Sequence, residues 1–329
     1  MTLYPLLFQP NLHPVVWGGY QLHPYKGLEP SHEPIGESWE VSVMPNSTSI
    51  ISNGQYAGQT LDQVISKHPQ AILGKSVNEK YGGQFPLLVK LIDAKHDLSI
   101  QVHPNDQMAM RQHGKSGKSE MWYIIKAESG SHIYAGFKKT ITPQEYRKHI
   151  ADGTIVDILA GYPVKAGDAF YLPAGSIHAI CGGIMLAEVQ QSSDLTYRIY
   201  DYNRPGMDGN LRELHTQLAL QALDYKANPN YRLEYPNEQN KVHQIIHTNH
   251  FDVQIIQATH KIHRNMLKHD SFVISMCLEG NSKLHINSTG QEITLKQGTT
   301  TLIPALLADY TIEPTGQSAR LLDTFVRIS

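Results

Sequence analysis

A seven-residue pattern that occurs twice constrains the fold of this chain more than any other feature of its sequence. GDAFYLP at 167–173 has a counterpart in GTTTLIP at 298–304, and each copy follows a predicted strand, a glycine-containing turn and another strand. This repetition predicts two copies of one β-fold. Such a fold closes about eight strands into a jelly roll, which holds small ligands in its mouth.

The composition also favours a mainly β chain and excludes several classes of partner. With 40% hydrophobic and 18% charged residues in 329, the chain is neither disordered nor a coiled coil. The net charge is −2, no basic run follows a phosphate backbone, and no apolar stretch is long enough to span a bilayer. We therefore expect neither nucleic acid nor a membrane as partner. The two cysteines, Cys181 and Cys277, indicate a reducing, cytoplasmic compartment.

The pattern along the chain predicts two domains with a few inserted helices. The polar segment 226–241 is predicted to link a first domain, residues 1–225, to a second, residues 242–329. Helical periodicity or helix-end signals predict helices at 60–73, 142–153 and 211–223. Residues 85–104 contain two strand-like segments separated by a short break, and we expect them to pair as adjacent antiparallel strands.

The two copies of the repeat differ after their shared proline. In the first copy, Pro173 is followed by Gly175 and then His178, which matches the second signature of the cupin superfamily. In the second copy, Pro304 is followed by ALLAD, with neither the glycine nor the histidine. We expect two cupin-type β jelly-roll barrels, of which the second is degenerate and metal-free.

Further ligands for a metal in the first barrel are found on neighbouring strands. Gln101 and His103 are two residues apart, so both side chains enter one cavity. Glu120 is the only carboxylate of the strand-like segment EMWYIIK and stands at its start. With His178, these residues offer two imidazoles, one carboxylate and one amide oxygen. That set suits Zn²⁺ with one position left open for water or substrate.

Several longer motifs resemble those of type I mannose-6-phosphate isomerases in their short bacterial form. The motifs are IGESWEVS at 35–42, QVHP at 101–104, GKSEMWY at 117–123, AGSIHA at 174–179 and the run from Glu188 to Arg198. The resemblance covers about residues 5–225 and implies one zinc ion per chain, bound by Gln101, His103, Glu120 and His178. It also assigns the family's arginine to Arg198.

Other charged residues fit an anionic sugar as substrate. Lys90 lies between apolar neighbours, and a buried lysine is costly unless it is paired, although a lysine reaching the surface is the common alternative. Arg198 on an interior strand is suited to a phosphate or a developing negative charge, unless it forms a structural pair with Glu188 or Asp201. Lys118 and Glu188 are the available proton carriers, and the sequence does not choose between them.

Together these features predict a zinc-dependent aldose–ketose isomerase. It would interconvert mannose 6-phosphate and fructose 6-phosphate through an enediolate, with Arg198, Lys118 or Glu188 as catalytic groups and Lys90 and Arg198 binding the substrate. Two alternatives remain: an iron-dependent cupin dioxygenase at the same two-histidine, one-carboxylate site, or a cupin that binds a phosphosugar without catalysis. The oligomeric state is left open.

Two other patterns are not expected to form ligand sites. GKSGKS at 114–119 imitates the end of a phosphate-binding loop, but a predicted strand follows where a helix is needed. Six histidines fall between residues 243 and 269, before the degenerate turn of the second barrel. We interpret them as solvated or core residues.

Overall fold

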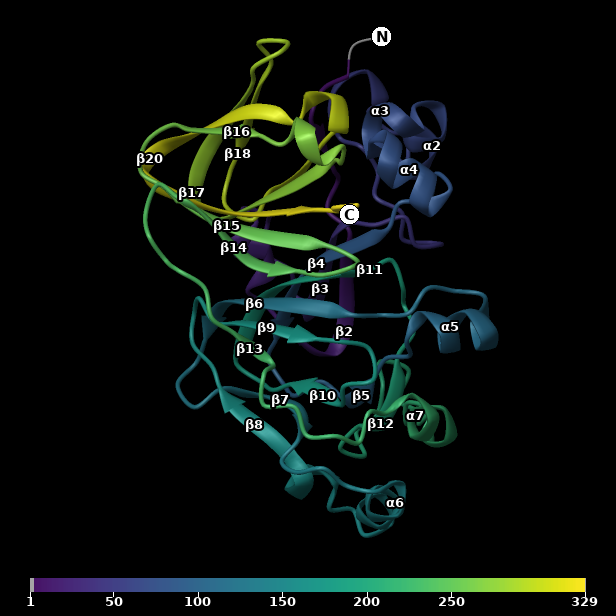
Figure 1. Ribbon diagram of the computed structural model, residues 1–329. Helices are drawn as coiled ribbons and strands as arrows, with labels where there is room; N and C mark the ends of the chain where they lie inside the picture. Colours follow the sequence, from purple (N-terminus) through teal and green to yellow (C-terminus); the bar gives the residue numbers. More distant parts are fainter. Residues whose placement is uncertain (1–2, 329) are drawn as a thin grey trace.

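The computed structural model describes residues 3–328, which form three antiparallel sheets arranged in successive layers (Figure 1). The first sheet has the spatial order β13 (Arg232–Leu233), β9 (Ala169–Leu172), β6 (Glu120–Ala127), β11 (Ile184–Gln191), β4 (Leu87–Ala94), β2 (Leu12–Gly19) and β3 (Ile35–Val41). The second sheet has the order β12 (Tyr197–Tyr200), β5 (Ile100–Val102), β10 (His178–Ile180), β7 (His132–Phe137) and β8 (Leu159–Pro163).

The third sheet is built almost entirely from the C-terminal part of the chain. Its order is β1 (Leu6–Leu7), β19 (Thr300–Ile303), β17 (Val273–Ile286), β20 (Asp309–Phe325), β15 (Asp252–Ala258) and β14 (Val242–His247), with β16 (Ile262–Asn265) paired to β20 and β18 (Glu292–Leu295) to β17. The expected mainly β fold with a few inserted helices is confirmed.

Seven short α-helices connect or cover the strands within the described residues. They are α1 (Leu22–Tyr25), α2 (Leu61–Lys67), α3 (Pro69–Leu73), α4 (Lys75–Tyr81), α5 (Asp106–His113), α6 (Pro143–Ala151) and α7 (Thr216–Ala222). In Figure 1, α2, α3 and α4 lie beside the third sheet, whereas α6 lies at the opposite end of the molecule. None of the helices in residues 3–328 is both long and apolar enough to cross a lipid bilayer.

The first sheet is covered on both faces, which explains its apolar sequences. Every residue of β4 and β11 is buried. One face contributes Val89 and Leu91 to a core shared with the third sheet. The opposite face contributes Ile92 to a core shared with Ile180 of the second sheet. A polar side chain on that second face, such as Lys90, is therefore enclosed between two sheets.

The expected pairing of residues 85–104 is wrong, and the error has a functional consequence. β4 and β5 belong to different sheets, because the chain crosses between the layers after Ala94. β5 pairs instead with β10 and β12. Lys90 and Gln101 consequently reach one cavity from opposite walls.

The helix predictions are confirmed in part. α6 begins after a Thr142–Glu145 capping box, as the 142–153 pattern predicts. The segment 60–73 is divided at Pro69, which starts α3, and α4 follows only after Gly74. The predicted helix at 211–223 is only α7, since residues 211–215 form a loop. α5 was not predicted.

Two strand pairings cross the predicted domain boundaries. β1, in the first 225 residues, pairs with β19 of the third sheet. β13, inside the predicted linker, pairs with β9 of the first sheet. The division into domains 1–225 and 242–329 with a linker at 226–241 therefore stays a prediction about folding units.

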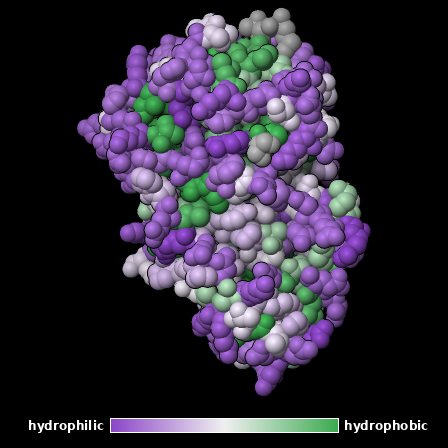
Figure 2. Space-filling view, in the orientation of Figure 1, coloured by the Kyte–Doolittle hydropathy of each residue, from purple (hydrophilic) through white to green (hydrophobic). Residues whose placement is uncertain are grey.

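Figure 2 shows that the face in view is largely hydrophilic, with hydrophobic side chains in small separate patches.

Candidate active site

Three strands bring the predicted metal ligands to one point between the first two sheets. His178 at the start of β10 pairs directly with Gln101 of β5, and His103 follows the end of β5. Glu120 opens β6 on the facing sheet. Ligand atoms of His103, Glu120 and His178 all lie within 4.8 Å of one another, and all three residues are buried.

Hydrogen bonds fix the orientation of both imidazoles. Nδ1 of His103 donates to the Leu195 carbonyl at 2.7 Å, and Nδ1 of His178 donates to the Ser176 carbonyl at 2.9 Å. Each Nε2 then keeps its lone pair and faces Glu120, at 3.3 Å from His103 and 3.1 Å from His178. A backbone acceptor on the far ring nitrogen is the usual second contact of a metal-binding histidine.

The site has the donors that a divalent cation requires. Among residues 3–328, Nε2 of His103 and both carboxylate oxygens of Glu120 are buried without a hydrogen-bond partner, an arrangement that is costly unless a ligand satisfies them. Burial, together with the Lys118 cation, lowers the pKa of His103 to about 3, so this imidazole is in the neutral, metal-binding form. These three predicted ligands fit a metal.

Gln101 reaches the same point but presents its amide nitrogen. Its Nε2 lies 3.3 Å from Nε2 of His178, and its Oε1 accepts from Ser99 Oγ at 3.4 Å. Rotating the amide by 180° would direct the oxygen to the metal position. Gln101 therefore has the reach of a fourth ligand.

A cavity of about 150 Å³ adjoins this group and collects the predicted catalytic and substrate-binding residues. Its lining includes Lys90, Gln101, Lys118, Glu188 and Arg198. The sequence thus identified five residues from five separate segments that the fold assembles around one space. A cavity on which several polar groups converge, beside a candidate metal centre, is a candidate small-molecule site.

Lys90 is enclosed and does not reach the surface. Only 7% of the residue is exposed. Its Nζ lies 3.3 Å from Glu37, 3.4 Å from Glu188 and 5.0 Å from the centroid of the Trp39 ring. Burial alone would lower the pKa of Lys90, but the carboxylates raise it above its ordinary value. Lys90 is therefore a permanent cation in the cavity.

The two candidate proton carriers differ in their surroundings. Lys118 Nζ lies 3.1 Å from Oε2 of Glu120, next to the metal position. Glu188 accepts a hydrogen bond from Trp122 Nε1 at 2.9 Å. Burial and the neighbouring Glu120 carboxylate raise the pKa of Glu188, which moves the group towards the range of a general base.

Arg198 does not form the structural ion pair that was the alternative to a functional role. Asp201 is occupied by Arg204 and Arg212, at 2.9 and 2.6 Å. Arg198 Nη1 donates to the Glu213 carbonyl at 3.0 Å, and its Nε is buried without a partner. Within the part of the chain that the structure describes, no carboxylate pairs with this guanidinium.

Comparison with known proteins identifies the family. The family model described as "Phosphomannose isomerase type I, catalytic domain" matches residues 6–123. A second family model, described as "Mannose-6-phosphate isomerase, cupin domain", matches residues 242–322. A probable mannose-6-phosphate isomerase of Bacillus subtilis, GmuF, is 33% identical over 313 residues, which is 95% of this chain and 97% of the relative. This chain belongs to the type I phosphomannose isomerase family.

Other members of the type I phosphomannose isomerase family agree. The mannose-6-phosphate isomerase of Streptococcus mutans is 41% identical over 219 residues, 67% of each protein. The crystal structure of the mannose 6-phosphate isomerase from Bacillus subtilis superposes with a TM-score of 0.87 at 31% identity, covering 98% of this chain and 99% of that one. A phosphomannose isomerase from Salmonella typhimurium, at 17% identity and a TM-score of 0.81, shares the fold. The cupin assignment is confirmed.

Two charged residues of the cavity in this phosphomannose isomerase family member were not predicted from the sequence. Glu37 lines it and lies inside the motif IGESWEVS, where strand alternation could have pointed to an inward carboxylate. Arg212 also lines it but comes from an irregular loop. No periodic signal marks that position.

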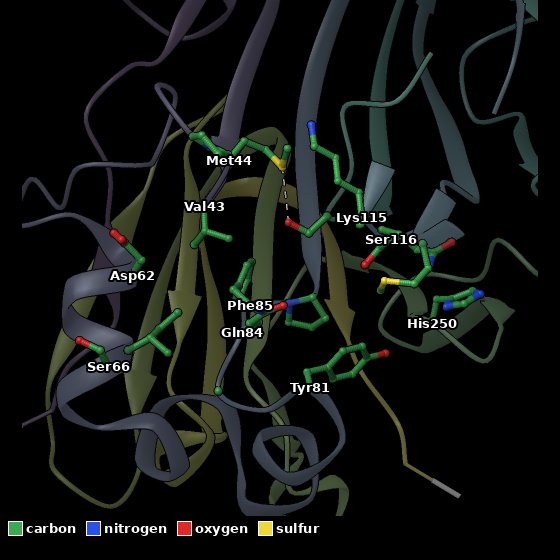
Figure 3. Close-up of a pocket in the computed structure, with 18 residues that line it drawn as sticks. Val43, Met44, Asp62, Ser66, Tyr81, Gln84, Phe85, Lys115, Ser116 and His250 are labelled. Carbon is green, nitrogen blue, oxygen red and sulfur yellow. Dashed lines mark hydrogen bonds between the residues drawn. The ribbon is translucent and has the colours of Figure 1, made fainter. Parts of the chain in front are cut away.

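A larger cavity, about 580 Å³, lies apart from this site (Figure 3). Its lining includes Val43, Phe85 and His250, together with Lys115 and Ser116 of the GKSGKS segment. β6 follows that segment, as its sequence predicts. None of the predicted metal-binding, catalytic or substrate-binding residues lines this cavity.

Two of the six histidines between residues 243 and 269 pair with different carboxylates. His247 Nδ1 lies 3.0 Å from Asp252, and His263 Nε2 lies 2.7 Å from Asp309. Each carboxylate lies on a neighbouring strand, so the spacing of residues within one strand could not predict these pairs. The absence of a metal from the second barrel stays a prediction that rests on its degenerate turn.

Proposed function

We propose that this protein interconverts mannose 6-phosphate and fructose 6-phosphate with one zinc ion per chain. The observation that carries the proposal is the buried His103–Glu120–His178 group, whose donor atoms converge on one point beside a cavity lined by charged side chains. Gln101 would be the fourth ligand. Family membership supports the substrate class, and two imidazoles with oxygen donors support zinc.

The cavity is suited to a phosphorylated sugar in its open-chain form. Lys90 and Arg198 are the proposed substrate-binding residues, since both are cations that line the cavity. The Arg198 guanidinium has no carboxylate partner among residues 3–328, and its planar donors match a phosphate. Glu37 and Glu188 balance Lys90, which limits the positive charge in its part of the cavity.

The isomerisation removes the proton from C2 of the aldose and returns one to C1 of the enediolate. We assign proton transfer to Glu188, because burial raises its pKa and the Trp122 indole holds the carboxylate in place. Lys118 is better suited to stabilise negative charge that develops on the substrate oxygens. A bound zinc ion supplies Lewis-acid stabilisation to the same oxygens. Arg198 adds a second positive charge.

Cysteine usage supports a cytoplasmic location within the same proposal. Cys181 and Cys277 are both buried and free. Burial raises the pKa of both thiols, so neither is activated as a thiolate. Unreactive buried thiols are the ordinary form of cysteine in a reducing compartment.

A coupled isomerase assay on the purified protein, with metal content measured in parallel, tests the proposal. Chelator treatment should remove both the zinc and the conversion of mannose 6-phosphate, and added Zn²⁺ should restore them. Oxygen consumption without sugar turnover would instead support an iron-dependent cupin dioxygenase. Tight sugar binding without exchange of substrate protons would support a non-catalytic phosphosugar-binding cupin.

A further inference from the structure

Strand β3 is a wall of the catalytic cavity. Because side chains alternate along a strand, Glu37 and Trp39 share one face. Glu37 lines the cavity and pairs with Lys90, and Trp39 Nε1 donates to Glu37 Oε2 at 2.6 Å. The Trp39 ring also faces the Lys90 ammonium. This face of β3 therefore sets the surroundings of Lys90.

The opposite face of β3 is attached to the second half of the chain through Glu40. Only 6% of Glu40 is exposed. Its Oε1 accepts from Lys26 Nζ at 2.6 Å and from Ser38 Oγ at 2.5 Å, and its Oε2 accepts from Thr300 Oγ1 at 2.8 Å. Lys26 Nζ also donates to the Gly298 carbonyl at 2.9 Å.

Gly298 and Thr300 belong to GTTTLIP, the second copy of the repeat, which carries no metal-binding turn. The contact is close, because a Cβ atom at Gly298 would lie 2.8 Å from the carbonyl oxygen of Tyr25. Gly298 also has a φ of 74°, a conformation that favours glycine. The degenerate repeat is therefore shaped to dock against the first half beside Lys26.

We propose that Glu40 is a positioning residue through which the degenerate repeat holds β3 in place. The hydroxyl of Thr300 fixes the Glu40 carboxylate, the carboxylate fixes β3, and β3 holds Glu37 and Trp39 against Lys90. The inference rests on the proposed function for the part that Lys90 plays in substrate binding. It gives the second barrel a task in the reaction that requires no metal there.

Thr300→Val removes the hydroxyl and keeps the shape of the side chain. A small displacement of Lys90 should raise KM for mannose 6-phosphate on the order of 10-fold with kcat little changed. Thr300→Ser restores the hydroxyl and should restore KM. Thr301→Val is the matched control, since Thr301 is the next residue, is fully buried and donates to the Leu6 carbonyl at 2.9 Å, away from β3. It should lower the melting temperature and leave KM unchanged.

Amide hydrogen exchange of residues 35–41 provides a readout that does not depend on turnover. Exchange should be faster in Thr300→Val than in wild type or Thr301→Val. Should Thr300→Val not fold, Glu40→Gln is the second perturbation, and the same changes are expected. Unchanged KM and unchanged exchange, or equal changes in Thr301→Val, would overturn the positioning role. A wild-type protein without turnover would overturn the proposed function instead, and the exchange data would still decide the role of Glu40.

Discussion

Replacing Arg198 by Ala separates a role in the reaction from a role in folding. The attachments of the Arg198 side chain are few: Nη1 donates to the Glu213 carbonyl, and no carboxylate pairs with the guanidinium among residues 3–328. Losing one hydrogen bond from a charged group to a carbonyl costs about 1.5–3 kcal/mol of unfolding free energy. The fold should therefore tolerate the substitution.

The expected effect on the reaction is much larger. Burial, with the nearby Arg212 cation, lowers the pKa of Arg198, so an anion beside this guanidinium would be strongly attracted. A unit charge 4 Å away interacts by roughly 4 kcal/mol at an effective dielectric constant of about 20. Removing one preorganised charge typically lowers the rate on the order of 100-fold to 1000-fold. We expect a loss in kcat/KM of that size.

Steady-state kinetics of Arg198→Ala and Arg198→Lys measure the effect and its origin. If the guanidinium acts in the transition state, Arg198→Lys lowers kcat and kcat/KM together. If it only anchors the phosphate, the lysine variant chiefly raises KM. Thermal unfolding of each variant controls for stability. Near-normal kinetics in a folded Arg198→Ala protein would show that Arg198 has no role in the reaction and is only a structural residue.

Three further substitutions test the metal site and the fold. His178→Ala should abolish zinc retention and turnover, and full zinc content by elemental analysis would contradict the ligand assignment. Tyr146→Phe should raise the free energy of unfolding by about 1 kcal/mol in denaturant titrations, because the buried Tyr146 hydroxyl has no partner; a clear loss would mean that the hydroxyl is satisfied. Burial alone would raise the pKa of Asp270, but hydrogen bonds from Ser76 and Lys75 lower it below the ordinary value. The ionised carboxylate therefore stabilises the fold at pH values above the unfolded pKa of about 3.9. This contribution to the free energy of unfolding is lost as the pH falls below that value. Wild type and Asp270→Asn should therefore differ most in stability near neutral pH, and a difference that grew in acid would contradict this sign.

Much of the candidate metal centre was predictable because its signals are local. Gln101 and His103 are two residues apart, in and just after one short strand, and His178 lies inside a short turn motif. Such spacings fix which side chains share a face before any long-range contact is known. Glu120 opens a strongly apolar strand, where a lone carboxylate is conspicuous.

The rest depends on contacts between distant segments. Glu37 joins the cavity only because β3 pairs with β4, and Arg212 does so from a loop without periodicity. The apolar segments around Lys90 and Gln101 resemble a hairpin, yet the chain crosses between the layers after Ala94, so they lie in different sheets. Local patterns do not distinguish these arrangements, because a strand buried on both faces has no alternation to show which face meets which partner.

Incubating mannose 6-phosphate with zinc-loaded protein in deuterated water, followed by NMR, measures directly whether the protein isomerises the sugar by proton transfer. We expect fructose 6-phosphate with solvent deuterium at C1 and returned mannose 6-phosphate with deuterium at C2, in both cases dependent on bound metal and absent in Glu188→Gln. Zinc-loaded protein that binds the sugar but neither converts it nor exchanges its C2 proton would contradict the proposed isomerase function.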